Sequence, residues 1–198
     1  VTIEPLPTLP DTSSPVLDAG EAAPSLALER GIAAHRLLQM LPATVSEQRE
    51  ALALRYLDHI GAAWPEGEKE RLWSSVEHIL SNPAFAPIFA SGSRAEVAIM
   101  GAVTIGGTER AVSGKIDRLA VTEDAVLVVD FKTGRPVPTS LSNVPAAHMA
   151  QMAIYAELVA PLYPGRTVRA ALVYTEGPYL VELDADTLAS ALAELTTA

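Results

Sequence analysis

The chain has 198 residues, of which 49% are hydrophobic and 19% charged, a composition typical of a globular protein with a sizeable core. It contains no cysteine, which excludes disulfides, thiolate zinc sites, thiol nucleophiles and iron–sulfur clusters held by cysteine. The 14 Lys and Arg against 24 Asp and Glu give a formal charge of −10, which argues against tight, autonomous binding to the phosphate backbone of nucleic acid.

The first 24 residues are predicted to form an extended linker. The segment VTIEPLPTLPDTSSPVLDAGEAAP contains five prolines together with Ser and Thr, and it shows no apolar periodicity. Because the chain begins at Val1 and not at a methionine, we expect it to be a fragment of a longer protein. It has no apolar run long enough to span a membrane and no signal-peptide pattern, so we expect a cytoplasmic protein without membrane contact.

Helices are predicted next along the chain. Apolar periodicity predicts helices at 25–41, 46–61 and 67–81, followed by a short helical turn broken by prolines at 82–89. Ser25 is positioned to cap the first of these helices. One predicted stripe of that helix carries Leu28, Ile32, His35 and Leu38.

His35 has two interpretations. A lone histidine on an apolar helical stripe is usually a core residue with satisfied hydrogen bonds, but a neutral imidazole is also a common metal ligand. Gly31 lies one turn before His35 and leaves room beside the ring for an approaching strand or a metal ion. The helix by itself leaves both interpretations open.

The second half of the chain changes to a strand pattern. Strands are predicted at 94–103, 109–121, 125–133, 167–175 and 178–183, and helices at 143–162 and 185–196. Gly106-Gly107 is a hairpin signal between the first two strands, and Asp184 is the expected cap of the last helix. This order of elements indicates an α+β, or mixed α/β, fold.

The third predicted strand, AVLVVDFKT, ends in an acid and a base. Asp130 and Lys132 point to the same face because side chains alternate along a strand. If Glu123 and Asp124 form a two-residue turn, position 119 pairs with 128 and Asp117 lies opposite Asp130. Two opposed carboxylates need a shared proton or a cation between them. The pattern therefore predicts a Mg²⁺ or Mn²⁺ site with Lys132 at its rim, and the alternative is solvated charges at a strand end.

Other polar residues are ambiguous from the sequence alone. Gln151 and Tyr155 are four positions apart on a predicted helix and share a face, as ordinary helix pairs also do. Glu96 is either an acid that supports the metal ligands or a surface charge. The histidines that belong to no motif, and that we expect to be structural or exposed, are His59, His78 and His148.

Four motifs in order give the chain a family resemblance. They are RGIAAHRLLQ (30–39), GKIDRL (114–119), VVDFKTGR (128–135) and QMAIY (151–155). With these motifs, residues 25–198 resemble the PD-(D/E)XK nuclease superfamily, and more closely the C-terminal nuclease domain of AddA/RecB-type helicase–nucleases. The resemblance implies a restriction-endonuclease-like core, a central mixed sheet flanked by helices, with extra N-terminal helices. One departure is that Ile116 stands where the superfamily's leading Pro-Asp motif has proline.

The resemblance also implies roles for individual residues. The metal ligands would be His35, Asp117, Asp130 and the carbonyl of Phe131, and the catalytic residues would be Asp117, Asp130, Lys132, Gln151 and Tyr155. The expected cofactor is Mg²⁺ or Mn²⁺, because oxygen ligands with one imidazole and no sulfur suit these ions better than zinc. An iron–sulfur cluster is not expected, since the chain has no cysteine.

The implied function is a magnesium-dependent deoxyribonuclease of the exonuclease type, acting in double-strand break repair and recombination. Its DNA would be a single strand fed by a covalently linked helicase domain, joined through the linker at 1–24, and an AddB-like subunit would be its partner. The location would be the bacterial cytoplasm, at the nucleoid. The alternative is a catalytically inactive nuclease-like module that binds DNA or a partner subunit, although such modules lose the metal ligands or the lysine and this chain keeps them.

Overall fold

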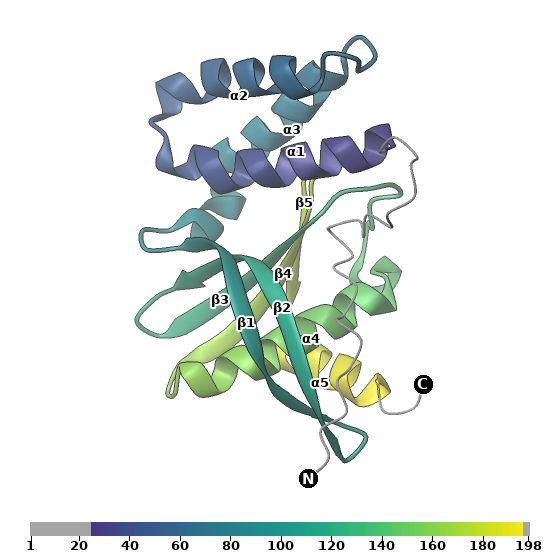
Figure 1. Cartoon of the computed structure of the whole chain (residues 1–198). Helices are drawn as coiled ribbons and strands as arrows, with labels where there is room; N and C mark the ends of the chain where they lie inside the picture. Colours follow the sequence, from purple (N-terminus) through teal and green to yellow (C-terminus); the bar gives the residue numbers. More distant parts are fainter. Residues whose placement is uncertain (1–24, 196–198) are drawn as a thin grey trace.

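A five-stranded sheet separates two groups of helices in the computed structural model, which describes residues 25–195 (Figure 1). The linker predicted at 1–24 and the end of the last predicted helix lie outside the described residues and stay predictions. Among the helices of the described part, none is both long and apolar enough to cross a lipid bilayer.

The helices occur where the sequence predicts them. The α-helices are α1 (Leu26–Met40), α2 (Ser46–Ile60), α3 (Glu68–Ser81), α4 (Ala146–Val159) and α5 (Ala185–Glu194). Short 3₁₀ helices are η1 (Leu41–Ala43), η2 (Pro83–Phe89), η3 (Leu141–Asn143) and η4 (Ala160–Leu162). The predicted caps are confirmed, since Ser25 and Asp184 accept backbone hydrogen bonds at the starts of α1 and α5.

The five strands form one mixed sheet. They are β1 (Arg94–Ile105), β2 (Thr108–Val121), β3 (Ala125–Lys132), β4 (Thr167–Tyr174) and β5 (Tyr179–Leu183). Their order in the sheet follows the chain, and only β3 and β4 are parallel, because α4 connects them across one face. This arrangement confirms the predicted mixed α/β class with a helix-flanked central sheet.

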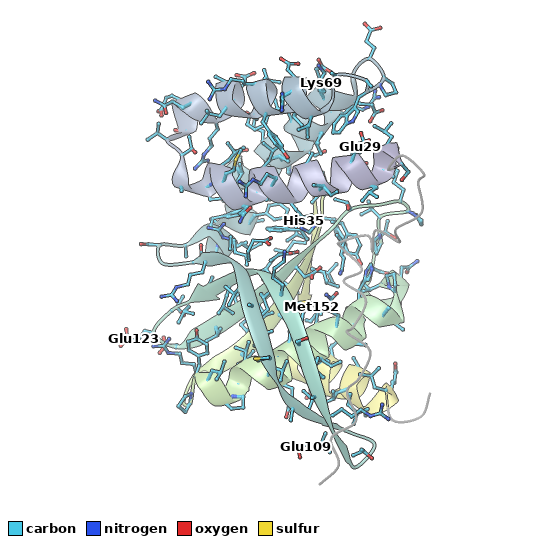
Figure 2. All side chains as sticks on the ribbon, viewed as in Figure 1. Glu29, His35, Lys69, Glu109, Glu123 and Met152 are labelled. Atoms are coloured by element: carbon cyan, nitrogen blue, oxygen red, sulfur yellow. The ribbon has the colours of Figure 1, made fainter. Side chains whose placement is uncertain are left out.

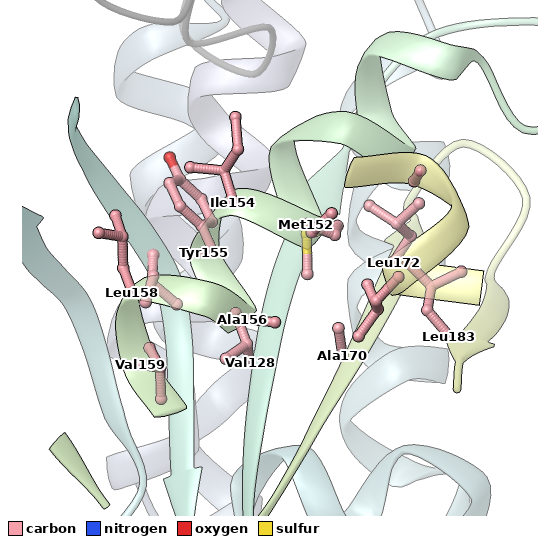
Figure 3. Packing of buried hydrophobic residues seen from close by; sticks show 14 of the residues in the cluster. Val128, Met152, Ile154, Tyr155, Ala156, Leu158, Val159, Ala170, Leu172 and Leu183 are labelled. Atoms are coloured by element: carbon pink, nitrogen blue, oxygen red, sulfur yellow. The ribbon is translucent and has the colours of Figure 1, made fainter. Parts of the chain in front are cut away.

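Each face of the sheet has its own core. Helices α4 and α5 cover one face and α1, α2 and α3 cover the other (Figure 1). Along β3, Val128 packs on the α4 side, as Figure 3 shows, whereas Val129 and Phe131 pack on the α1 side. Asp130 and Lys132 alternate with Phe131 and therefore follow Val128 on the α4 side.

The β2–β3 hairpin has the predicted register. Val121 pairs with Val126 and Leu119 with Val128, as a two-residue turn at 123–124 requires. Glu-Asp is not a favoured turn sequence, and the structure shows what supports it. The Thr122 hydroxyl accepts a hydrogen bond from the Ala125 N–H at 3.1 Å, and the Thr122 N–H donates to the Ala125 carbonyl at 2.9 Å.

Two predicted details are wrong. The helix predicted at 143–162 is regular only between Ala146 and Val159, because Pro145 and Pro161 confine the flanking residues to single 3₁₀ turns. Ile32 does not share the core stripe of α1, since it is 50% exposed. The buried face of α1 is formed by Gly31, Ala33, Ala34, Leu37 and Leu38.

Candidate active site

Asp117 lies at an irregularity in the sheet. Glu96, which the β1–β2 register places opposite Asp117, has a positive φ of 56°, a conformation that costs energy for a non-glycine residue. The β2–β3 ladder also ends one residue away from Asp117. The paired residues nearest to Asp117 are Ala95 with Arg118 and Val97 with Ile116 between β1 and β2, and Arg118 with Val129 between β2 and β3.

The irregularity changes the direction of the side chains on β2. Ile116 and Leu119 pack in the same core cluster on the α4 side, although residues three apart on a regular strand face opposite sides. The alternation therefore shifts around Asp117. The shift lets Asp117 reach both its neighbouring strand β3 and the helix α1 above the sheet.

The Asp117 carboxylate joins β3 to α1. Its Oδ2 accepts a hydrogen bond from the Phe131 backbone N–H at 2.7 Å, and its Oδ1 lies 3.4 Å from His35 Nδ1. The carboxylate thus takes the place of a backbone acceptor where the ladder has ended. Asp117 is only 5% exposed, so these contacts are made largely out of water.

His35 lies on the side of α1 that faces the sheet (Figure 2). Its ring makes an edge-to-face contact with Phe131, with ring centroids 5.9 Å apart. Gly31 explains how the helix approaches the site so closely, because a Cβ at this position would lie 2.7 Å from Thr133 Oγ1. Burial lowers the pKa of His35, but the hydrogen bond and charge of Asp117 and the charges of Asp130 and Glu96 outweigh burial and raise the pKa overall.

Asp130 and Lys132 form a buried ion pair. Asp130 is fully buried and Lys132 is 2% exposed, and Lys132 Nζ lies 2.8 Å from Asp130 Oδ2. The ammonium also donates to Gln151 Oε1 on α4 at 2.7 Å. Burial and the charge of Asp117 raise the pKa of Asp130 to about 7, although Lys132 and His35 act in the opposite direction.

Gln151 and Tyr155 continue a chain of hydrogen bonds from the lysine to β2. Gln151 Nε2 donates to the Tyr155 hydroxyl at 3.2 Å, and this hydroxyl donates to the Lys115 carbonyl at 3.1 Å. The chain connects α4, β3 and β2, and it fixes the direction of the Lys132 ammonium. Gly114 makes room for it, since a Cβ there would lie 2.6 Å from Tyr155 Cε1.

We expect Gly114→Ala to displace Tyr155 and to lower the free energy of unfolding by about 1–3 kcal/mol, because the added methyl group overlaps a buried ring. Urea unfolding measures the loss. Gly101→Ala is the matched control on the same hairpin, because its methyl group would meet only the flexible end of Leu158. Equal losses for the two variants would contradict the steric argument, and Gly114→Ala/Tyr155→Leu should recover part of the stability.

The site has donors that suit a divalent cation. Within the described residues, the buried atoms His35 Nε2 and Asp130 Oδ1 have no hydrogen-bond partner. Unpaired polar atoms of this kind are costly unless a ligand satisfies them, and carboxylate oxygens with an imidazole are suitable ligands for Mg²⁺ or Mn²⁺. As the side chains stand, no three His, Asp or Glu residues in the described part are already gathered as a metal cluster. The donors fit the metal in kind, and the predicted ligand set stays a prediction.

A cleft of about 180 Å³ opens at the His35 side of this site. Its lining includes His35, Asp117, Glu96, Lys115 and the exposed Ile32. Glu96 forms an ion pair with Lys115 at 2.5 Å, so it belongs to the cleft and is not an isolated surface charge. Its charge is one of those that raise the pKa of His35, and its role toward the metal ligands stays a prediction.

Two residues that the structure brings close to the site have no role in the sequence motifs. His148, which we expect to be structural or exposed, is half-buried, lines a cavity together with Lys132, and has its Nδ1 3.0 Å from the Tyr174 hydroxyl. Glu176 is another, because its carboxylate pairs with Arg30 of α1 at 2.6 Å and with Arg135 after β3 at 3.2 Å. Its neighbour Gly177 signals the turn between β4 and β5 but not this bridging contact.

Comparisons with known proteins place the chain in a family. The model of the PD-(D/E)XK nuclease superfamily matches residues 14–195, which is most of the chain. Among solved structures, the crystal structure of SSO0001 is similar at 18% sequence identity over 83% of this chain and 74% of that one, with a TM-score of 0.33, too low to bear on function. No curated protein matches the chain.

Proposed function

Because the chain belongs to the PD-(D/E)XK nuclease superfamily, we propose that the site around Asp117, Asp130 and Lys132 hydrolyses DNA phosphodiester bonds with the help of Mg²⁺ or Mn²⁺. The observation that carries this proposal is the buried row of two carboxylates and an ammonium. Lys132 lies between Asp130 and Gln151, and the imidazole of His35 stands against Asp117. Buried charged groups whose pKa values are shifted by burial and by one another, as those of His35 and Asp130 are, are typical of functional sites.

Each residue has a defined task in the proposed reaction. His35, Asp117 and Asp130, with the Phe131 carbonyl, would hold the cation, which when bound lowers the pKa of water and neutralises phosphate charge. Lys132 would orient the attacking water and lie close to the negative charge that develops on the phosphate. Gln151 holds the Lys132 ammonium, and Tyr155 holds Gln151, so both position the lysine.

We also propose a setting for the reaction. The motifs resemble those of the nuclease domain of AddA/RecB-type helicase–nucleases, and the charge of −10 suits a domain that is supplied with DNA by a tethered motor. In this proposal the enzyme is a magnesium-dependent exonuclease for single-stranded DNA in double-strand break repair and recombination. A linked helicase domain and an AddB-like subunit would be its partners in the bacterial cytoplasm.

The decisive experiment compares the chain with its Asp117→Asn variant on labelled single-stranded DNA. We expect cleavage with Mg²⁺ or Mn²⁺, none with EDTA, and a loss of at least about 10²-fold in the variant, because Asp117 contacts both His35 and β3. Glu123→Gln is the control, since it removes an exposed acid from the same hairpin. Cleavage that survives Asp117→Asn, or a wild type that binds DNA with Mg²⁺ and never cuts it, would contradict the proposal and favour an inactive binding module.

A further inference from the structure

A second cavity has a volume of about 530 Å³. Its walls come from the loop after β3, the start of α4 and the end of β4, and none of its lining residues lines the cleft beside His35. The volume is in the range of small-molecule sites and is large enough for one nucleotide. Nothing in the proposed reaction uses this cavity, although Lys132 forms part of its wall.

The lining of this cavity combines apolar side chains with polar ones. Pro136, Val137, Pro138 and Pro145 supply the apolar part, and Asn143 and His148 are among the polar residues. The faces of a nucleobase pack on apolar and ring-shaped side chains, and its edges need donors and acceptors. The cavity therefore has the chemistry of a base-binding site.

The cationic residues of the cavity suit the phosphate of the same nucleotide. Lys132, which pairs with Asp130 of the proposed reaction centre, lines the cavity, and Arg135 is a second cation in its wall. The Arg135 side chain is 68% exposed and therefore accessible to a strand. His148 adds no charge near neutral pH, because burial and then the charge of Lys132 lower its pKa to about 4.

The residues that line the cavity are held by contacts with one another and with their neighbours. Glu176 fixes Arg135 through Nε at 3.3 Å and Nη2 at 3.2 Å, and the Tyr179 hydroxyl donates to the Thr139 carbonyl at 3.3 Å. His148, another lining residue, is paired with Tyr174. Because these side chains are already held in place, little conformational entropy would be lost when a ligand binds. This favours a role for the cavity in binding.

We propose that this cavity binds one unpaired nucleotide of the DNA strand, the one adjacent to the phosphate that is cut. The inference rests on the proposed function and extends it to the choice of substrate. In duplex DNA every base is stacked and paired, and placing one in the cavity would require flipping it out of the helix. The cavity therefore selects single strands over duplexes.

The test uses strands in which one phosphodiester is cleavable and its neighbours are phosphorothioates. A single abasic site is moved along the strand, and affinity is measured by fluorescence anisotropy with Ca²⁺ in place of Mg²⁺. We expect weaker binding, by roughly 5- to 100-fold, when the abasic site lies next to the cleavable bond on one side. Thr139→Trp, which fills the cavity from an exposed wall position, should weaken binding of the intact strand similarly and leave binding of that abasic strand unchanged.

The controls separate this inference from the proposed function. Met100→Trp, at a position on β1 that is 80% exposed, should bind both strands like wild type. His148→Ala provides a second cavity variant if Thr139→Trp does not fold by circular dichroism, and it should show the same dependence on the base. Equal weakening of intact and abasic strands by the cavity variants would overturn the inference, as would no effect of the abasic site at any position. Failure of the wild type to cut with Mg²⁺ would count against the proposed function alone.

Discussion

Replacing Lys132 by methionine is expected to lower the rate of strand cleavage by about 10²–10⁴-fold at saturating DNA and Mg²⁺. Lys132 is nearly fully buried, and its ammonium is aimed by Asp130 at 2.8 Å and Gln151 at 2.7 Å. Such a fixed cation stabilises the negative charge that develops on the phosphate. Water would have to reorient to do the same, which raises the barrier of the reaction. Methionine keeps the length and apolar stem of the side chain and removes only the charge and its hydrogen bonds.

The effect should appear in kcat with a much smaller change in KM, because the lysine acts on the developing charge more than on the bound strand. Single-turnover kinetics on labelled DNA measure this difference. Lys69→Met is the matched control, since Lys69 pairs with Asp58 between α3 and α2 and lines neither of the two cavities described above. A loss confined to KM, or an equal loss for Lys69→Met, would contradict the assigned role.

Gln151 provides a finer measure of the same arrangement. Its amide oxygen accepts from Lys132 and its amide nitrogen donates to Tyr155. Gln151→Leu keeps the lysine and its charge but removes one of the groups that aim it, so its loss of kcat should lie between those of wild type and Lys132→Met. A loss as large as that of Lys132→Met would make Gln151 more than a positioning residue.

The sequence predicts the local part of this site well. The register of β2 and β3 follows from alternating apolar residues and a short turn. It predicts Asp117 opposite Asp130, one position beyond the last observed pair, Arg118 with Val129. Tertiary effects modify the result. The ladder ends one residue earlier, and the Asp117 carboxylate accepts from Phe131 in place of further strand pairing. The positive φ of Glu96 has no sequence signal, because glutamate rarely adopts this conformation.

Contacts between distant segments are harder to predict. Periodicity put His35 on a stripe with Ile32, but the helix turns Ile32 outward, and His35 borders the sheet instead of the helical core. Glycine has no side-chain pattern, so the close approaches of Gly31 to Thr133 and of Gly114 to Tyr155 appear only once the layers are packed. The family motifs supplied what propensity could not, since they mark residues that meet only in the folded chain.

Asp130→Asn should abolish cleavage and should remove the part of the pH dependence of stability that ionisation of Asp130 contributes in the metal-free protein. Burial and the charge of Asp117 raise the pKa of Asp130 from 3.8 to about 7. Because the folded pKa lies above the unfolded one, the native state binds more protons between about pH 4 and 7, and the free energy of unfolding falls as the pH rises through this range. Asparagine cannot ionise, so this contribution should disappear in the variant.

Urea unfolding from pH 4 to 7 in EDTA, followed by tryptophan fluorescence, measures the expected difference in slope. His35 and His148 also titrate in or near this range, with pKa values shifted in opposite directions, so the informative quantity is the difference between wild type and variant. Asp124→Asn, at an exposed turn position, should give a curve parallel to that of the wild type. Saturating Mg²⁺ should flatten the wild-type curve at the upper end, because a cation that binds only the folded state offsets the cost of ionising Asp130. If the Asp130→Asn curve runs parallel to the wild type in EDTA, ionisation of this carboxyl group costs the fold nothing, and the electrostatic argument for a cation at the site loses its main support.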